Sequence, residues 1–374
     1  MISLLFFIFL NISIGLLMGI TPYINRRDIP FGVSIPVTDK TKEVVNAQKK
    51  SYLFINLGIA IIINIGIFLY GQFKPNISEE KLVYLCIVSL FIMLGISLVS
   101  YVLKHNELKK YKQTLSLEMK QTKKIVVDLS FRDEKLIFPT SYLVGINLAF
   151  VLVTVLLTVF NYQNIPDKLV TQWDFNMNPT TITEKTWGSV MMIPAMQVFI
   201  TIVMAISNQA YLSAKQQIDG KNPTASSTKS KKFRRQSSLL NLVISILTQL
   251  LFVAIQLVTV FESISPKVVM ILSLVFTILI IGLVLWFSLY YGQSGDRLKT
   301  IEINEEEAPK GNIVTVDDDE NWKLGMFYFN KQDPSFWVEK RMGVGMTFNL
   351  AKWQSWAFLI GVIVLPLLLV FLFM

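Results

Sequence analysis

Four acidic residues lie side by side from Asp317 to Glu320, and carboxylate oxygens are the ligands that Ca²⁺ and Mg²⁺ prefer. The tract lacks the glycine turn and the twelve-residue spacing of a calcium loop, so it is more typical of a solvated acidic patch. Together with Lys340 and Arg341 it comes nearest to a catalytic cluster in this chain. It offers no nucleophile and no paired base, so we expect no metal, no cofactor and no enzymatic activity.

The other residues with ligating or catalytic chemistry are isolated. His105 is the only histidine, which excludes a His-x-x-x-His zinc pair and disfavours a Ser-His dyad. It stands beside Lys104 at the end of an apolar run, where we expect a solvated side chain. Cys86 is the only cysteine, so an intramolecular disulfide and a cysteine metal cluster are excluded. The absence of a Gly-x-x-x-x-Gly-Lys phosphate loop argues against an ATP-driven pump.

The composition indicates that these residues lie in or between membrane-spanning helices. The chain has 374 residues, of which 52% are hydrophobic and 16% charged, against about 25% charged in soluble domains. A membrane-spanning helix needs about 20 apolar residues. Eight runs meet that requirement, at about 2–20, 52–71, 82–103, 142–160, 188–208, 238–260, 268–291 and 354–373. None has an ionisable residue well inside it, which counts against proton-coupled carriers and intramembrane aspartyl proteases.

The loops between these runs alternate in basic charge. The first, third, fifth and seventh loops hold 30 of the 35 Lys and Arg residues. Because positively charged loops stay in the cytoplasm, we expect both termini and the fourth loop, residues 161–187, to lie outside. The sequence thus predicts a multi-pass protein of the cell membrane, with the lipid bilayer as its first partner. The net charge of +9 is explained by orientation rather than by nucleic-acid binding.

The fold class that follows is an all-α polytopic membrane protein with about eight transmembrane helices and a small cytoplasmic β-rich patch. The expected parts are an N-terminal membrane bundle (1–160), an external loop with the fifth span (161–208), a basic flexible cytoplasmic linker (209–237), two spans (238–291), a cytoplasmic segment (292–353) and the last span (354–374). Alternating, β-branched or aromatic residues typical of strands occur at 31–37, 124–131, 135–140, 324–330 and 336–349. The basic stretch 106–124 is typical of a helix lying on the membrane surface.

One predicted span carries a polar stripe. Its members recur at helical spacing in the run 238–260, as Asn241, Ser245, Thr248, Gln249 and Gln256. Hydrogen bonds between helices are the favoured interpretation, and the lining of a polar path is the alternative.

The external loop is the best candidate for a recognition surface. Trp173 and Phe175 are aromatic anchors that suit a peptide partner and equally suit the membrane interface. Asp174 adds a carboxylate for a cationic peptide. The alternative is that the loop merely caps the fourth and fifth spans.

The stretch "NIPDKLVTQWDFNMNPTTITEK" resembles the bacterial membrane family called domain of unknown function 1648. The match rests on Ile165, Pro166, Trp173, Pro179 and Lys185. Gln172 stands where that family usually has His, and Met177 stands near its usual Gly, so the role of that His is not carried over. The resemblance completes the candidate ligand-binding set, which is Gln172, Trp173, Asp174, Phe175, Pro179 and Lys185.

A second resemblance covers "DENWKLGMFYFNKQDPSFWVEKRMGVGMTFNLAK", which is similar to domain of unknown function 5808. The matching residues are Trp322, Gly325, Tyr328, Asn330, Asp333, Pro334, Val338, Lys340, Arg341, Gly343, Gly345 and Asn349. From these we expect a cytoplasmic patch made of Trp322, Tyr328, Asn330, Asp333, Lys340, Arg341 and Asn349.

The first family is similar to the N-terminal part of the immunity protein of the sporulation-delay toxin system. That Gram-positive membrane protein protects its producer from a secreted peptide and captures a repressor. The resemblance implies a non-enzymatic receptor or immunity protein, with a secreted peptide outside and a regulatory protein inside as partners. The alternative is a transporter or permease that is not coupled to intramembrane ionisable residues.

Overall fold

The computed structural model describes residues 2–73, 79–115, 124–126, 135–174, 178–215, 218–219, 223–261, 263–299, 313–315 and 318–373. Eight helices in this part of the chain are long and apolar enough to cross a membrane. They are α1 (Ile2–Ile24), α2 (Asp39–Phe73), α3 (Glu79–Thr114), α5 (Thr140–Asn161), α6 (Trp187–Ser213), α7 (Pro223–Val260), α8 (Pro266–Tyr291) and α9 (Trp353–Phe373). Each contains one predicted span, so the all-α membrane fold is confirmed.

Three helices are much longer than a membrane is thick. α2, α3 and α7 have 35, 36 and 38 residues, against the roughly 20 that a span requires. The stretch 106–114, expected to lie on the membrane surface, instead continues α3, and 115–124 is outside the helices that are described.

The expected flexible linker 209–237 is also different. Residues 209–213 end α6, and 223–237 form the first turns of α7. Pro223 is compatible with a helix start because its missing N–H would have no helical partner there. Phe233 and Arg234 are then buried against the rest of the protein, so tertiary packing overrides a composition that is typical of disorder.

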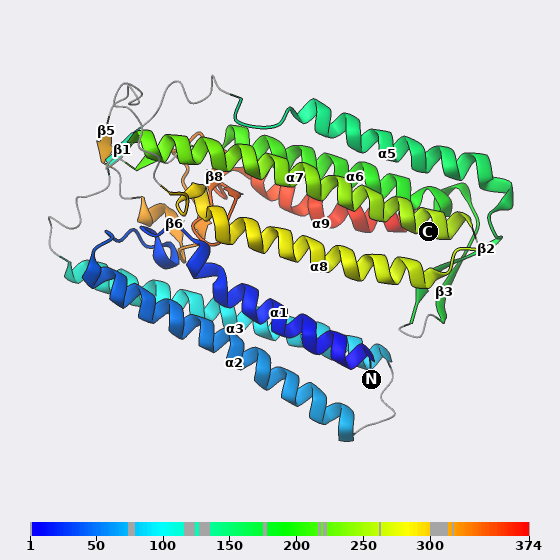
Figure 1. Cartoon of the computed structure of the whole chain (residues 1–374), viewed down its shortest axis with the longest axis horizontal. Helices are drawn as coiled ribbons and strands as arrows, with labels where there is room; N and C mark the ends of the chain where they lie inside the picture. Colours follow the sequence, from blue (N-terminus) through cyan, green and yellow to red (C-terminus); the bar gives the residue numbers. More distant parts are fainter. Residues whose placement is uncertain are drawn as a thin grey trace.

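The helices form two bundles, one of α1, α2 and α3 and the other of α5 to α9 (Figure 1). In the second bundle the polar stripe of α7 faces its neighbours. Gln256 Nε2 lies 2.7 Å from Thr158 Oγ1 of α5, and Gln249 Nε2 lies 3.1 Å from Thr201 Oγ1 of α6. Ser245 accepts a hydrogen bond from Asn147 at 3.0 Å. The stripe therefore joins helices, which favours the interpretation as interhelical hydrogen bonding.

Short strands and turns occupy both ends of the bundles. The strands are β1 (Lys124–Val126), β2 (Lys168–Trp173), β3 (Pro179–Glu184), β4 (Ile218–Asp219), β5 (Ile313–Thr315), β6 (Trp322–Lys323), β7 (Phe327–Tyr328), β8 (Trp337–Glu339) and β9 (Met346–Phe348). All pairs are antiparallel: β1 between β4 and β5, β2 with β3, β6 with β7, and β8 with β9.

Two stretches with strand-like texture are not strands. Residues 30–32 form the 3-10 turn η1 (Pro30–Gly32), and the extended residues after it pair with no strand that the structure describes. Residues 135–139 lead directly into α5 without strand pairing. The texture of 324–330 and 336–349 does produce β7, β8 and β9. β-branched and aromatic residues favour extended backbone, but pairing depends on tertiary neighbours.

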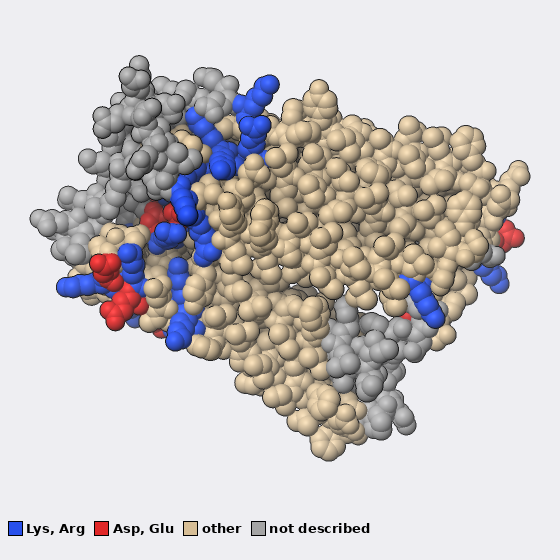
Figure 2. All heavy atoms as spheres, viewed as in Figure 1, with Lys and Arg blue, Asp and Glu red and all other residues tan. Residues whose placement is uncertain are grey.

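The two ends of the molecule differ in charge. Lys and Arg side chains gather at the end that holds β6 and β8, which we call the basic end (Figure 2). Strands β2 and β3 lie at the opposite end, the hairpin end, and both chain termini lie there too (Figure 1).

Candidate functional site

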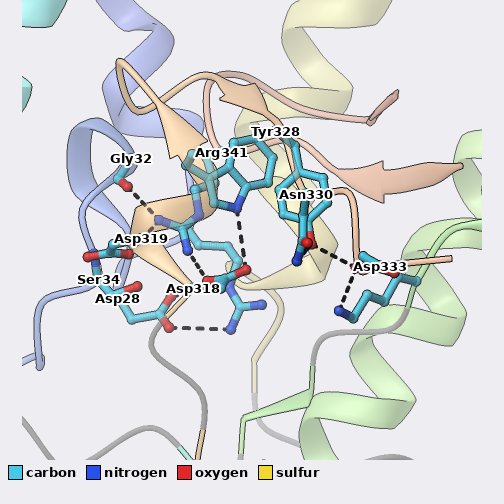
Figure 3. Close-up of polar contacts among 12 residues, drawn as sticks. Asp28, Gly32, Ser34, Asp318, Asp319, Tyr328, Asn330, Asp333 and Arg341 are labelled. Atoms are coloured by element: carbon cyan, nitrogen blue, oxygen red, sulfur yellow. Dashed lines mark hydrogen bonds and ion pairs between the residues drawn. The ribbon is translucent and has the colours of Figure 1, made fainter. Parts of the chain in front are cut away.

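Arg341 lies at the centre of the polar cluster at the basic end. It follows β8, and its side chain is 1% exposed. The guanidinium donates to Asp318 and Asp319, and to Gly32 O at 2.6 Å (Figure 3). It also lies 5.0 Å from the ring centroid of Trp322, a cation–π distance. One side chain thus connects the C-terminal segment with the loop that follows α1.

Asp319 is the second bridging residue of this cluster. Besides Arg341, it accepts from Lys112 Nζ of α3 at 2.7 Å and from the Ser34 backbone N–H at 3.1 Å. Burial alone would raise the pKa of Asp319, but Arg341 and Lys112 outweigh that effect and hold the pKa below its usual value. The carboxylate is therefore charged and fully engaged at neutral pH.

The loop between α1 and α2 is shaped to receive this cluster. Phe31 and Gly32 have φ angles of 49° and 77°, in the left-handed region that favours glycine. A Cβ on Gly32 would clash with the backbone of Gly325, which follows β6. Nδ1 of His105, on α3, lies 2.8 Å from Phe31 O, and the residue is 6% exposed. The prediction of a solvated histidine is therefore wrong. The cause is the loop, which folds back over the end of α3.

We call these contacts the clamp, made of Arg341, Asp318, Asp319 and Trp322 with the loop 25–37. The clamp joins the α1–α3 bundle to the segment that leads into α9. Gly343 N–H adds a hydrogen bond to Asn25 Oδ1 at 2.7 Å.

A second group of the predicted cytoplasmic patch surrounds Asp333. Its carboxylate accepts from Tyr328 Oη at 2.7 Å and Lys215 Nζ at 2.8 Å (Figure 3). Burial tends to raise the pKa of Asp333, but these donors and the Ser335 N–H lower it to about 2. Tyr328 also contacts Trp322, with ring centroids 5.1 Å apart. Asp333 thus connects the patch to the end of α6.

Asn349 organises the turn before α9. Its Nδ2 donates to Asn330 O at 2.7 Å, and its Oδ1 accepts from Asn330 N at 3.0 Å. Its backbone carbonyl accepts from Ser355 Oγ at 2.7 Å. The Asn349 side chain is fully buried, and it satisfies the backbone N–H and C=O of Asn330, which pair with no strand that the structure describes. Of the seven predicted patch residues, only Lys340 lies apart, with an exposed side chain.

Close to this patch lies a buried ion pair that no sequence pattern predicted. Arg234 of α7 and Glu339 of β8 lie 3.3 Å apart, and each side chain is 1% exposed. Ser294 Oγ donates to the other Glu339 oxygen at 2.5 Å, and Arg234 donates to Tyr211 O and Ala214 O. Arg234 stands in a run of Lys, Ser and Arg, so no sequence signal separates it from its solvated neighbours.

The candidate ligand-binding residues that the structure describes lie at the hairpin end, on β2, β3 and the turns beside them. Asp174 caps the hairpin turn, accepting from Asn178 N at 2.7 Å and Asn178 Nδ2 at 2.8 Å. Gln172 accepts from Thr181 Oγ1 at 3.0 Å. Trp173 pairs in register with Pro179. Phe175 and Met177 lie outside the described residues.

The base of the hairpin is fixed to the helix ends. Lys185 Nζ donates to Ile165 O at 2.6 Å and lies 3.2 Å from Asp167. Trp187 stacks on Tyr162 with ring centroids 3.9 Å apart and planes within 6°. The hairpin is therefore held in a defined position, and several of the predicted binding residues contribute to that structure.

The charged side chains of the clamp form an ion-pair network. No group of three or more His, Cys, Asp or Glu side chains among them is placed to hold a metal ion. Asp318 and Asp319 are neutralised by Arg341 and Lys112. Asp317 lies outside the described part of the chain.

Comparison with known families gives two matches. Residues 149–198 match Domain of unknown function (DUF1648), which spans the second half of α5, the hairpin and the start of α6. Residues 331–356 match Family of unknown function (DUF5808), which includes Asp333, Lys340, Arg341 and Asn349. Comparison with curated proteins and with solved structures gives no significant match. The chain is therefore a multi-pass membrane protein that carries both of these domains.

Proposed function

We propose that this protein is a non-enzymatic receptor or immunity protein of the cell membrane, which recognises a secreted peptide or an envelope component through the β2–β3 hairpin. The observation that carries the proposal is the exposure of the hairpin. Leu169 packs its inner face onto the helix ends at 4% exposure, while Ile182 on β3 is 57% exposed.

The strand edges of the hairpin suit peptide binding. β2 and β3 pair only with each other among the described strands, so each presents an outer edge with backbone donors and acceptors. An extended peptide can add to such an edge through main-chain hydrogen bonds, while exposed side chains such as Ile182 supply specificity. The exposed apolar side chain beside a free edge therefore supports recognition of an extended peptide.

Orientation follows from charge. Loops rich in Lys and Arg remain in the cytoplasm, so the basic end faces inward and the hairpin and both termini face outward. The clamp, at the basic end, connects both bundles, and the exposed residues beside it, such as Leu324 and Phe327, provide a surface for a regulatory protein. Ligand binding at one end and partner binding at the other would then be coupled through the relative position of the bundles.

Survival of a sensitive Gram-positive host against a panel of secreted antimicrobial peptides tests the proposal. Cells that express the protein should survive at higher peptide concentrations than cells with empty vector. Ile182→Ser should remove that protection, because it deletes exposed apolar surface and leaves the Asp174 turn and the Lys185 anchor intact. Ile182→Val is the matched control and should protect. Equal protection by both variants, at equal amounts in the membrane, would contradict recognition through the hairpin.

Orientation is tested separately with single cysteines in a background without Cys86. A cysteine at the exposed position Thr180 should react with an impermeant maleimide in whole cells. A cysteine at exposed Lys331, at the basic end, should react only after the cells are opened. The reverse pattern would place the hairpin in the cytoplasm.

One observation favours the alternative function, transport. An apolar cavity of about 460 Å³ lies between α1, α3 and α8, where the two bundles face each other, and is lined by residues such as Leu17, Leu90 and Leu285. Its lining suits an apolar or amphiphilic solute rather than an ion. Leu285→Trp would fill it. Loss of protection in Leu285→Trp but not in Ile182→Ser would indicate removal of the peptide by transport instead of recognition at the hairpin.

A further inference from the structure

A second cavity, of about 850 Å³, lies at the basic end between the two bundles. Its walls come from the end of α1, the loop 27–37, the first turns of α2 and α7, and the residues around the end of α8. Seven cationic side chains line it: Arg27, Lys42, Lys49, Lys229, Lys232, Arg297 and Lys299. The described residues that line it include no Asp or Glu.

Most of these cationic side chains have no ion-pair partner among the residues that the structure describes. Arg27 lies 3.7 Å from Asp296, and Lys42 lies 3.2 Å from the fully exposed Asp39. The four remaining lysines have no carboxylate within ion-pair distance among the residues that the structure describes: Lys49, Lys229, Lys232 and Lys299. Within the described part of the chain, the cavity therefore concentrates positive charge with few compensating carboxylates.

Burial of the Lys49 ammonium group in this cavity is energetically unfavourable unless an anion lies beside it. It lies on α2 and is 8% exposed, and its nearest aromatic partner is Tyr23, whose ring centroid is 5.8 Å from Nζ. A buried ammonium group normally has a carboxylate or a ligand beside it, because desolvation of an unpaired charge is unfavourable. An anion in the cavity would supply that partner.

Arg297 is fixed in place as one wall of the cavity. Its Nη1 donates to Leu289 O at 2.8 Å and its Nη2 donates to Tyr23 O at 2.7 Å, so it connects the ends of α1 and α8. Burial and the nearby Arg27 lower the pKa of Arg297, and Asp296 only partly opposes them. This side chain is therefore pre-positioned in an electropositive site.

We propose that this cavity binds a phosphate-bearing anion. Phosphate oxygens accept several charge-assisted hydrogen bonds at once, which matches a cavity lined by many Lys and Arg donors. The apolar residues Val45, Leu289 and Leu298 line the same space, at the level where the transmembrane helices end. Anionic lipid headgroups lie at this depth, and basic pockets between transmembrane helices on the cytoplasmic side bind them. A soluble phosphate compound has the same chemistry and would enter from the aqueous side.

Native mass spectrometry of the full-length protein, released from detergent, tests the proposal and separates the two sources. The probes are dioctanoyl phosphatidylglycerol and inorganic pyrophosphate, with dioctanoyl phosphatidylcholine as the zwitterionic control. Binding of phosphatidylglycerol in preference to phosphatidylcholine supports a lipid headgroup. Binding of pyrophosphate alone supports a soluble phosphate compound.

Variants connect the binding to the cavity. Lys49→Met and Lys229→Ala should each weaken binding by about tenfold to a hundredfold, the loss expected for one hydrogen bond to a charged group. Lys331→Ala removes an exposed charge at the same end and should bind like the unmodified protein. Lys229 is only partly buried, so its variant remains informative if Lys49→Met does not fold. Failure of both phosphate probes to bind, or equal affinity in all three variants, would overturn the proposal.

Discussion

Removing the Arg341 side chain should loosen the clamp while both helical bundles stay folded. Arg341 is 1% exposed, and the two carboxylates that it neutralises, Asp318 and Asp319, are 17% and 13% exposed. In Arg341→Ala these carboxylates would remain close together in a poorly solvated site. The hydrogen-bond and cation–π partners of Arg341 are Gly32, Asp318, Asp319 and Trp322, none of which lies in a transmembrane helix, so the helices should be unaffected.

The size of the effect follows from the burial. Removing one partner of a buried ion pair costs about 3 to 5 kcal/mol. The lower end applies, because Lys112 still lies 2.7 Å from Asp319 and Trp322 Nε1 still lies 3.4 Å from Asp318. About 3 kcal/mol corresponds to about a hundredfold larger population of the open clamp.

Hydrogen–deuterium exchange in nanodiscs measures this population. The amide of Ser34 donates to Asp319 at 3.1 Å, so it reports directly on the closed clamp. Its peptide should exchange about a hundredfold faster in Arg341→Ala, if exchange occurs through local opening. Peptides from the centres of α6 and α7 should be unchanged.

Two further variants make the measurement decisive. Arg341→Lys keeps the charge but loses the planar fork that contacts two carboxylates, so its exchange should fall between those of the unmodified protein and Arg341→Ala. Lys331→Ala, an exposed cation on the same segment, should exchange like the unmodified protein. If Arg341→Ala exchanged no faster than Lys331→Ala, the reasoning that the ion pairs close the clamp would be refuted.

Three other predictions concern the ion pairs of Asp319 and Asp333, the turn at Gly32, and the helix contacts of Gln256. In the folded protein the pKa of Asp319 lies below its usual value and that of Asp333 is about 2, so the stabilisation from these two carboxylates is present above about pH 4 and is lost as the pH falls further; the thermal midpoint should therefore drop below pH 4. Gly32→Ala should lower that midpoint by the equivalent of about 2 kcal/mol or more, from left-handed backbone strain plus a backbone clash, whereas Gly66→Ala, with open space around it, should not. Gln256→Leu should lower the free energy of reversible unfolding in detergent micelles by about 0.6 to 2 kcal/mol, because two interhelical hydrogen bonds are lost. An unchanged free energy would show that these bonds do not contribute to stability.

The spans could be predicted because the membrane imposes a length and a polarity on each helix. All eight apolar runs lie in helices of the structure. The polar stripe of α7 was also readable, since helical spacing places its members on one face and lipid cannot satisfy their hydrogen bonds. These are local properties, and local sequence reports them.

The family resemblance pointed to the residues of the patch at the basic end, but the sequence did not indicate their contacts. Arg341 and Asp319 were recognisable as charged residues of one segment, while their partners Gly32 and Lys112 lie far away in the sequence. Arg234 carried no distinguishing signal. Its partner Glu339 is 105 positions away, and burial alone separates this pair from the solvated charges nearby.

Sequence by itself determined the membrane fold, the number of spans and the expected orientation, because hydropathy and loop charge act on each segment separately. Only the tertiary structure decided that the loop 25–37 folds over His105 and meets Arg341, that 223–237 is helical, and that seven cations surround one cavity. The physical reason is that ion pairs, burial and cavities depend on which distant segments meet, and the helix ends bring those segments together only in the folded protein.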